Sequence, residues 1–135
     1  MTAGVAAGLV SGWLNTQRTS GNGGGAYSAV AGTFAQLHTA DPGAAGTTAV
    51  SEGDATRKEF VFAASTGGSA LSLDSGPSAW TNGGTSETLT HISVWTASED
   101  GTFLFSVALD DAKAWADGDT FTLTELSMSL SPQAA

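Results

Sequence analysis

From Ser28 onward, apolar and polar residues alternate along most of the chain with a period of two. Alternation of this kind is typical of strands that bury one face. It predicts strands over 33–39, 59–64, 70–74, 87–97, 102–109 and 120–130, with short additions near 27–31, 47–51 and 78–81. Turn sequences separate them, at Thr66-Gly67-Gly68, Asn82-Gly83-Gly84, Glu99-Asp100-Gly101 and Asp117-Gly118-Asp119. Short strands separated by such turns predict an antiparallel sandwich or barrel.

Three details of this pattern need structural explanation. In the last strand Phe121 and Leu123 have one parity and Leu126 the other, so the strand either contains a β-bulge near 124–125 or crosses between two sheets. The segment 111–116 interrupts the alternation, and we expect one helical turn or an irregular loop there. Asp41-Pro42-Gly43 predicts a chain reversal, because proline pre-sets φ and glycine accepts a positive φ.

The pattern differs at the N-terminus, where apolar residues have helical spacing. Val5, Leu9 and Trp13 recur at every fourth position, which predicts a helix whose start Thr2 would cap, with Gly4, Gly8 and Gly12 on one face. Either Trp13 packs this helix on the domain, or the helix docks on a partner. The candidate partner-binding residues are Val5, Leu9, Trp13 and Leu14. A glycine-rich joint at 20–25 follows, so we divide the chain into an N-terminal arm over 1–32 and a β-sandwich domain over 33–135.

Composition narrows the class of partner. The chain has 135 residues, enough for one modest core, and a formal net charge of −9 from 13 acidic and four basic residues. This charge disfavours binding to nucleic acid or to an anionic membrane. The absence of cysteine excludes disulfides and thiolate metal sites. We find no signal sequence and no apolar run long enough for a membrane span, so we expect the chain to stay in the cytoplasm of the cell that makes it.

Candidate chemistry is sparse. His38 and His91 are the two possible bases, each inside a predicted strand without a recognisable nucleophile motif. Neither they nor the carboxylates show metal-ligand spacing, and Asp117-Gly118-Asp119 is explained as a turn. We therefore predict no enzyme activity, no catalytic residue, no cofactor and no metal.

Tryptophans provide the remaining binding signal. Trp95 alternates within a long strand, which predicts a core position, whereas Trp80 lies beside a turn and Trp115 lies in the irregular segment. We treat Trp80 and Trp115 as possible surface aromatics. Exposed aromatic rings on a β-sandwich can stack on sugar rings, so a carbohydrate-binding module is an alternative function.

Four blocks of sequence, in this order, resemble a family of small virion proteins of tailed phages, many of which infect actinobacteria. The blocks, which span about residues 33–131, are TFAQLHTADPG at 33–43, ATRKEFVFAA at 55–64, the pair THISVWTA at 90–97 and GTFL at 101–104, and DGDTFTLT at 117–124. Proteins of this family are described as head decoration, head fibre or minor tail proteins. The resemblance implies an all-β, antiparallel, jelly-roll-like sandwich, here with a short N-terminal helix or arm, and it brings no catalytic residues. The first 30 residues depart from the family's pattern.

The resemblance also implies a function. We expect a structural virion protein that decorates the outer surface of the head, binds the major capsid protein and stabilises the assembled shell. A homotrimer suits local threefold positions on such a shell. The arm over 1–32 is the candidate anchor. A minor tail protein at the tail tip is the alternative location.

Overall fold

A computed structural model describes residues 3–18, 28–65 and 70–129 of the chain. It contains one helix, α1 (Ala7–Asn15), among strands that all pair in antiparallel fashion. The strands are β1 (Ala3–Val5), β2 (Phe34–His38), β3 (Lys58–Glu59), β4 (Val61–Phe62), β5 (Ala70–Ser75), β6 (Trp80–Thr81), β7 (Glu87–Trp95), β8 (Phe103–Trp115), β9 (Thr120–Phe121) and β10 (Ser127–Ser129). The expected all-β, sandwich-like fold with a short N-terminal helix is confirmed, and the jelly-roll detail stays a prediction.

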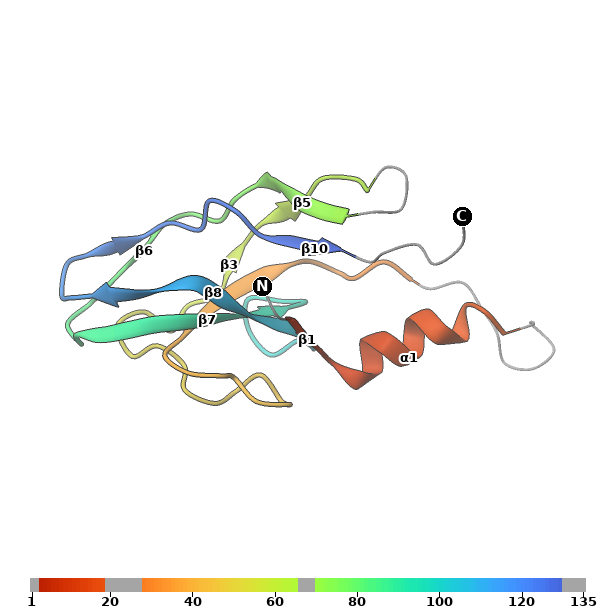
Figure 1. Cartoon of the computed structure of the whole chain (residues 1–135), viewed down its shortest axis with the longest axis horizontal. Helices are drawn as coiled ribbons and strands as arrows, with labels where there is room; N and C mark the ends of the chain where they lie inside the picture. The colour runs from red at the N-terminus through yellow and green to blue at the C-terminus, as the bar shows by residue number, and fades with distance from the viewer. Residues whose placement is uncertain (1–2, 19–27, 66–69, 130–135) are drawn as a thin grey trace.

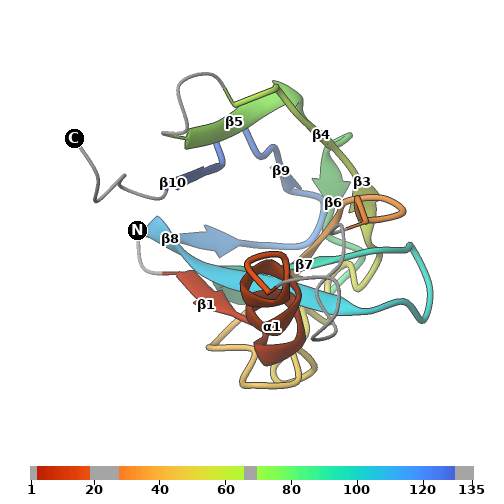
Figure 2. The ribbon, with the colours of Figure 1, turned by 90° about the vertical axis from the view of Figure 1, so that its right-hand side faces the viewer.

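The strands form two layers (Figure 1, Figure 2). One layer is a five-stranded sheet in the order β1-β8-β7-β2-β3. The facing layer consists of the sheet β10-β5-β4 and the pair β6-β9. The core between them is formed by apolar side chains from both layers, among them Leu37, Trp80, Leu89, Ile92, Val94, Phe105, Val107, Trp115 and Leu126. Burial of this apolar surface is the main force that holds the layers together.

Two predicted strands are divided in the structure. The segment 59–64 becomes β3 and β4, because Phe60 turns into the core and its N–H bonds the Thr33 carbonyl at 3.0 Å. The last predicted strand becomes β9, which pairs with β6, and β10, which pairs with β5. The change of parity therefore marks a crossing between two partners, as one of the two alternatives predicted.

The expectation of a helical turn or loop at 111–116 is wrong, because β8 continues to Trp115. Its second half pairs with the start of β7, from Glu87↔Trp115 to Leu89↔Lys113. A register shift then separates this part from the regular pairing that resumes at His91↔Ala108. The extra residues of β8 form an irregularity that lets both ends of a long strand keep their partners.

The N-terminal segment also differs from expectation. Residues 3–5 form β1, an edge strand on β8, and the helix begins only at Ala7 with Ala6 at the N-cap. The predicted cap, Thr2, lies outside the described residues. Gly4 lies opposite Ser106 in this pairing and does not share a helical face with the later glycines. Residues 3–5 form a strand because β8 offers them backbone hydrogen-bond partners at the edge of the sheet. The division at residue 32 stays a prediction, and its glycine-rich joint lies outside the described residues.

Two of the three short additional strands that the sequence predicts, near 27–31 and 47–51, do not form regular strands in the described residues. Residues 28–31 are irregular, and between 47 and 51 the chain forms a single bridge, Val50 with His38. The addition near 78–81 is confirmed as β6.

Candidate binding surface

The outer face of the five-stranded sheet, opposite the core, is covered by the loop 39–54. The reversal at Asp41-Pro42-Gly43 starts this loop as predicted: Gly43 has φ +75°, and its N–H bonds the Asp41 carboxylate at 2.8 Å. The loop returns beside β2, where the Ser51 N–H bonds the Leu37 carbonyl at 2.9 Å. The loop thus acts as a second cover for the sheet, below β7 and β2 in Figure 1.

Under this loop, three polar side chains from β2 and β7 form a buried chain of hydrogen bonds. His38 Nδ1 lies 2.8 Å from the Thr48 carbonyl oxygen, which can only accept, so Nδ1 carries the proton. Nε2 then accepts from the Ser93 hydroxyl at 2.7 Å, and Ser93 Oγ accepts from Trp95 Nε1 at 2.8 Å. Every donor and acceptor in this chain is satisfied with His38 neutral.

Burial is the largest cause that lowers the pKa of His38 below its ordinary value of 6.5, and the hydrogen bond to the Thr48 backbone acts in the opposite direction. The pair of Ser93 and His38 has the spacing of a nucleophile and its base. Both residues are 0 % exposed, however, and the third partner is a loop carbonyl rather than a carboxylate. The pair fixes the loop, and no substrate reaches it in this structure.

Sequence reasoning missed this pair, because Ser93 lies on β7, 55 residues from His38. The sequence does indicate that Ser93 and Trp95 share one face of a strand, because they are two positions apart in an alternating segment. Trp95 is buried as predicted, but on this outer face rather than between the layers. The Arg57 guanidinium stacks 3.7 Å from the centre of the Trp95 ring. It also donates to the Asp100 carbonyl at 2.6 Å, which attaches Arg57 to the turn between β7 and β8.

A carboxylate fixes the end of the loop. Glu87, at the start of β7, accepts a hydrogen bond from the Ser51 hydroxyl and from the Gly53 N–H at 3.1 Å. Gly53 approaches closely here, since a Cβ on it would lie 2.6 Å from Trp115 Nε1. The loop is therefore fixed at its start, its middle and its end.

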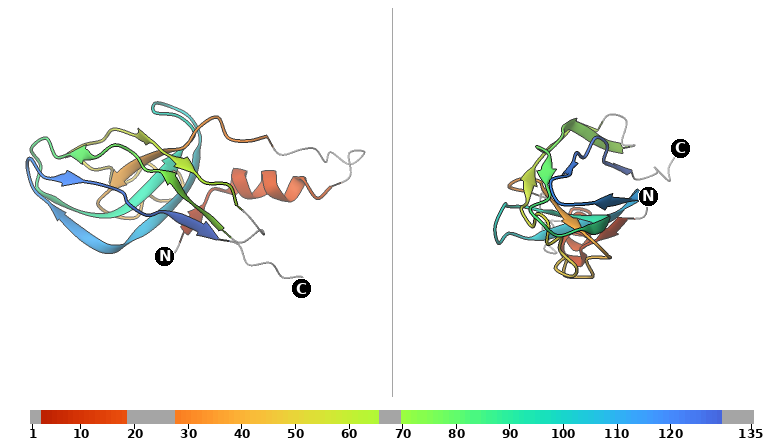
Figure 3. Two further views of the ribbon diagram at one scale, coloured as in Figure 1. Left: turned by 90° about the horizontal axis from the view of Figure 1, so that it is seen from above. Right: turned by 90° about the vertical axis from the view of Figure 1, so that its left-hand side faces the viewer.

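The helix α1 contrasts with the loop. It projects beyond the end of the sheets beside the segment that leads into β2 (Figure 3), and none of its residues is buried. Leu14 is 64 % exposed, and Val10 and the nearby Val30 are each 37 % exposed. We name the set Leu9, Val10, Trp13, Leu14 and Val30 the N-terminal face.

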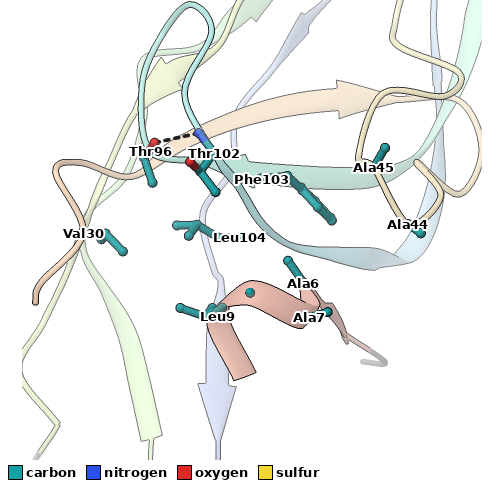
Figure 4. Close-up of a pocket in the computed structure, with 11 residues that line it drawn as sticks. Ala6, Ala7, Leu9, Val30, Ala44, Ala45, Thr96, Thr102, Phe103 and Leu104 are labelled. Carbon is teal, nitrogen blue, oxygen red and sulfur yellow. Dashed lines mark hydrogen bonds between the residues drawn. The ribbon is translucent and has the colours of Figure 1, made fainter. Parts of the chain in front are cut away.

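A groove of about 490 Å³ adjoins this face (Figure 4). Leu9 and Val30 lie at one side of it, Phe103 and Leu104 line it from β8, and Ala44 and Ala45 come from the loop. The lining is mainly apolar and contains no charged residue. Such a groove suits an apolar side chain from another protein rather than a charged ligand.

Charge is distributed unevenly along the chain. Residues 1–40 contain one charged residue, Arg18, so the remaining 95 positions carry all 13 carboxylates against three basic residues. The N-terminal face therefore comes from a segment without carboxylates in an acidic protein. A neutral apolar face is the kind of surface that soluble proteins cover with a partner.

The structure places the predicted site residues as follows. Val5 and Leu9 are partly buried and pack against the core, whereas Trp13 is half-buried and Leu14 is exposed. The structure brings Leu9, Trp13 and Leu14 together on one helix, and places Val5 on the adjacent strand. Whether they bind a partner stays a prediction.

The expectation that Trp80 and Trp115 are surface aromatics is wrong, since they are 0 % and 3 % exposed and belong to the core. Trp80 faces inward from β6, and its Nε1 donates to the Thr56 carbonyl at 2.9 Å. The Trp115 side chain lies in the core, because the segment around it is the end of strand β8 rather than a loop. Neither ring can stack on a sugar in this structure.

In residues 3–18, 28–65 and 70–129, no group of three His, Asp or Glu side chains is placed to hold a metal ion. Over the same ranges, no helix has the length and apolar character needed to cross a membrane.

The fold and its surface define a small all-β domain with a packed core and an N-terminal helix in which no residue is buried. Residues 13–131 match the model of the protein family described as podophage GP4 fiber I protein gp80. The chain belongs to this family. No curated protein matches the chain. The resemblance to phage structural proteins is thus confirmed at the level of a virion protein, and the family's description is of a fiber rather than a head decoration protein.

Proposed function

We propose that the chain is a non-enzymatic structural subunit of a phage virion, which takes part in a fiber on the outside of the particle. The family match over residues 13–131 is the observation that carries this proposal. Two features of the structure support it. The buried Ser93–His38 pair serves to hold a loop. Among the described residues, three of the four exposed large apolar side chains, Val10, Leu14 and Val30, lie at a helix and a groove rather than at a catalytic cleft.

The N-terminal face is the surface through which we propose that the chain contacts the rest of the assembly. It combines exposed apolar side chains with an adjoining apolar groove, and it lies in the neutral part of the chain. The acidic remainder suits an outward-facing surface, because a negative surface stays soluble and discourages non-specific contacts when many copies are close together.

We propose the head as the place of attachment, with the major capsid protein and further copies of the chain, as a homotrimer, as partners. The support for this placement is the sequence resemblance to head decoration and head fibre proteins. Each copy then adds a modest interface to the shell, and the many equivalent sites add up to a stabilised particle. The tail tip is the alternative place of attachment.

Labelling and copy number on purified virions test the proposal. An antibody or a gold-labelled tag on the chain should mark particles of the phage that encodes it, and quantitative mass spectrometry should give its copy number relative to the major capsid protein. Many copies distributed over the head support the proposal, and a few copies at the tail tip support the alternative. Absence of the chain from purified virions contradicts both.

A further inference from the structure

The helix α1 lacks several of the interactions that usually stabilise a short helix. Its N-cap, Ala6, makes no side-chain hydrogen bond, its first turn has no acidic residue, and its last turn has no basic residue. None of its nine residues is buried, and two of them are glycine. Isolated helices of this length are marginal in water, because nucleation is costly and few hydrogen bonds follow. A second surface that covers the helix would supply the missing stabilisation.

The side chains of α1 are arranged to accept such a cover. Leu9 and Trp13 lie one turn apart, as do Val10 and Leu14, so the four form one apolar stripe along the helix. Leu9 is half-buried and faces the groove beside Val30 (Figure 4), whereas Leu14 is 64 % exposed. The stripe therefore begins at the groove and continues into the most exposed large apolar side chain of the described residues.

Charge indicates what covers this stripe. Two copies of a chain with a net charge of −9 repel one another wherever their acidic regions meet. The first 40 residues contain no acidic residue, so the side chains of the N-terminal face can meet those of a second copy without a carboxylate from either segment in the contact. Every copy carries the same apolar stripe, so the stripes of two or three copies can pack against one another.

We infer that the N-terminal face is a homo-oligomer interface, in which α1 of one copy packs against α1 and the adjoining groove of another copy. This inference rests on the proposed function and names the surface through which the copies in the fiber associate. Leu14 and Val10 supply the contact between helices. The groove adds area that the helix alone lacks, because a nine-residue helix is only about 14 Å long.

The small area of this contact limits its strength. Stable protein interfaces bury about 800 Å² on each partner, and one short helix covers less than that. Free copies should therefore associate weakly and in a concentration-dependent manner. Assembly on the virion raises the local concentration of the copies and so favours the contact.

Sedimentation equilibrium with the full chain tests the inference. The wild-type chain should show reversible association, and Leu14→Glu should weaken the association constant at least tenfold, because it introduces a charge into an apolar contact. Val61→Glu is the matched control: Val61 is also an exposed apolar residue, at 49 %, but lies on β4 away from the N-terminal face. This control should associate like the wild type, and circular dichroism and thermal melting should show that both variants fold.

A cross-linking experiment gives an independent reading. Because the chain has no cysteine, Leu14→Cys and Val61→Cys each introduce a single thiol. Mild oxidation should convert the Leu14 variant to disulfide-linked dimers at concentrations where the Val61 variant stays monomeric. Equal cross-linking of the two variants contradicts the inference, as does a wild-type chain that remains monomeric at its highest soluble concentration.

The outcome also separates this inference from the proposed function. Presence of the chain in purified virions, together with equal association of the Leu14→Glu and wild-type chains, overturns the inference alone. Absence from virions, together with loss of association in Leu14→Glu, overturns the proposed function and supports the interface.

Discussion

The loop 39–54 and the helix α1 both lie outside the sandwich, yet they are held in different ways. The loop is fixed by buried hydrogen bonds to His38 and to the Glu87 carboxylate, and by the packing of Gly46 on Phe103. The helix has no buried residue and is joined to the sheet mainly through β1. The difference indicates that the loop belongs to the fold of the single chain, and it is consistent with the proposal that the helix contacts another molecule.

The largest effect is expected where the loop is most tightly packed. Gly46 has φ +73°, and a Cβ on it would place three ring carbons of Phe103 within 2.8 Å. Gly46→Ala should lower the free energy of unfolding by about 2–4 kcal/mol, through both overpacking and backbone strain. Gly118→Ala is the matched control, since Gly118 has φ +83° with nothing within 4 Å, and should cost only about 1 kcal/mol. Urea unfolding measures both, and equal losses would show that the loop is not packed as described.

The buried chain of hydrogen bonds should give the next largest effect. Ser93→Ala removes the hydroxyl between His38 and Trp95, and leaves a buried acceptor and a buried donor unpaired. We expect a loss of about 2 kcal/mol in the free energy of unfolding. Ser106, directly opposite Ser93 on β8, is the control position, where the same substitution should cost less. If the two serines prove equivalent, the hydrogen-bonded chain does not hold the loop.

Stability should decrease as the pH falls below about 6.5. The pKa of His38 is lowered in the folded chain, so below its ordinary value of 6.5 the unfolded chain binds a proton that the folded chain does not. The contribution of His38 is therefore fully present above pH 6.5 and is lost as the pH falls toward the lowered pKa, by up to about 1.4 kcal/mol per pH unit. Unfolding measured between pH 7.5 and 5.5 checks this. A His38→Asn variant should show a shallower dependence, and an identical slope in both chains would rule out His38 as the source.

The smallest effect on the single chain should come from the helix. Leu14→Ala changes a side chain that is 64 % exposed, so in dilute solution its effect on the free energy of unfolding should stay within about 0.5 kcal/mol. A loss of 2 kcal/mol or more, measured by urea unfolding where the chain is monomeric, would mean that the helix is already part of the fold.

The sequence predicted the elements whose side chains alternate regularly. Strands such as β2, β5 and β7 lie close to their predicted positions, because one face of each meets the core. The long β8 was missed after residue 109, since Asp110, Asp111 and Lys113 are exposed and do not reveal the pairing of this part with the start of β7. β1 was missed for a related reason. Its three residues, Ala3–Val5, are small or apolar and fit the start of a helix, and only the distant pairing with β8 makes them a strand.

The candidate surface could be predicted only in part. The helical spacing of Leu9, Trp13 and Leu14 correctly indicated an apolar helical stripe, because this spacing is local. Trp80 and Trp115 were wrongly placed on the surface, because their burial depends on strands β6 and β8 that pair over long distances in the sequence. The Ser93–His38 contact likewise arises from the register of β2 with β7.

Hydrogen–deuterium exchange tests the contrast between loop and helix most directly, in the free chain and in the assembled virion. In dilute free chain, the amides of the loop that bond within the fold, such as those of Thr39, Thr48 and Ser51, should be protected, and those of α1 should exchange quickly. In the virion, the α1 amides should become protected while the loop amides remain unchanged. Protection of α1 in dilute free chain, or exchange of α1 that is as fast in the virion as in the free chain, would contradict the account.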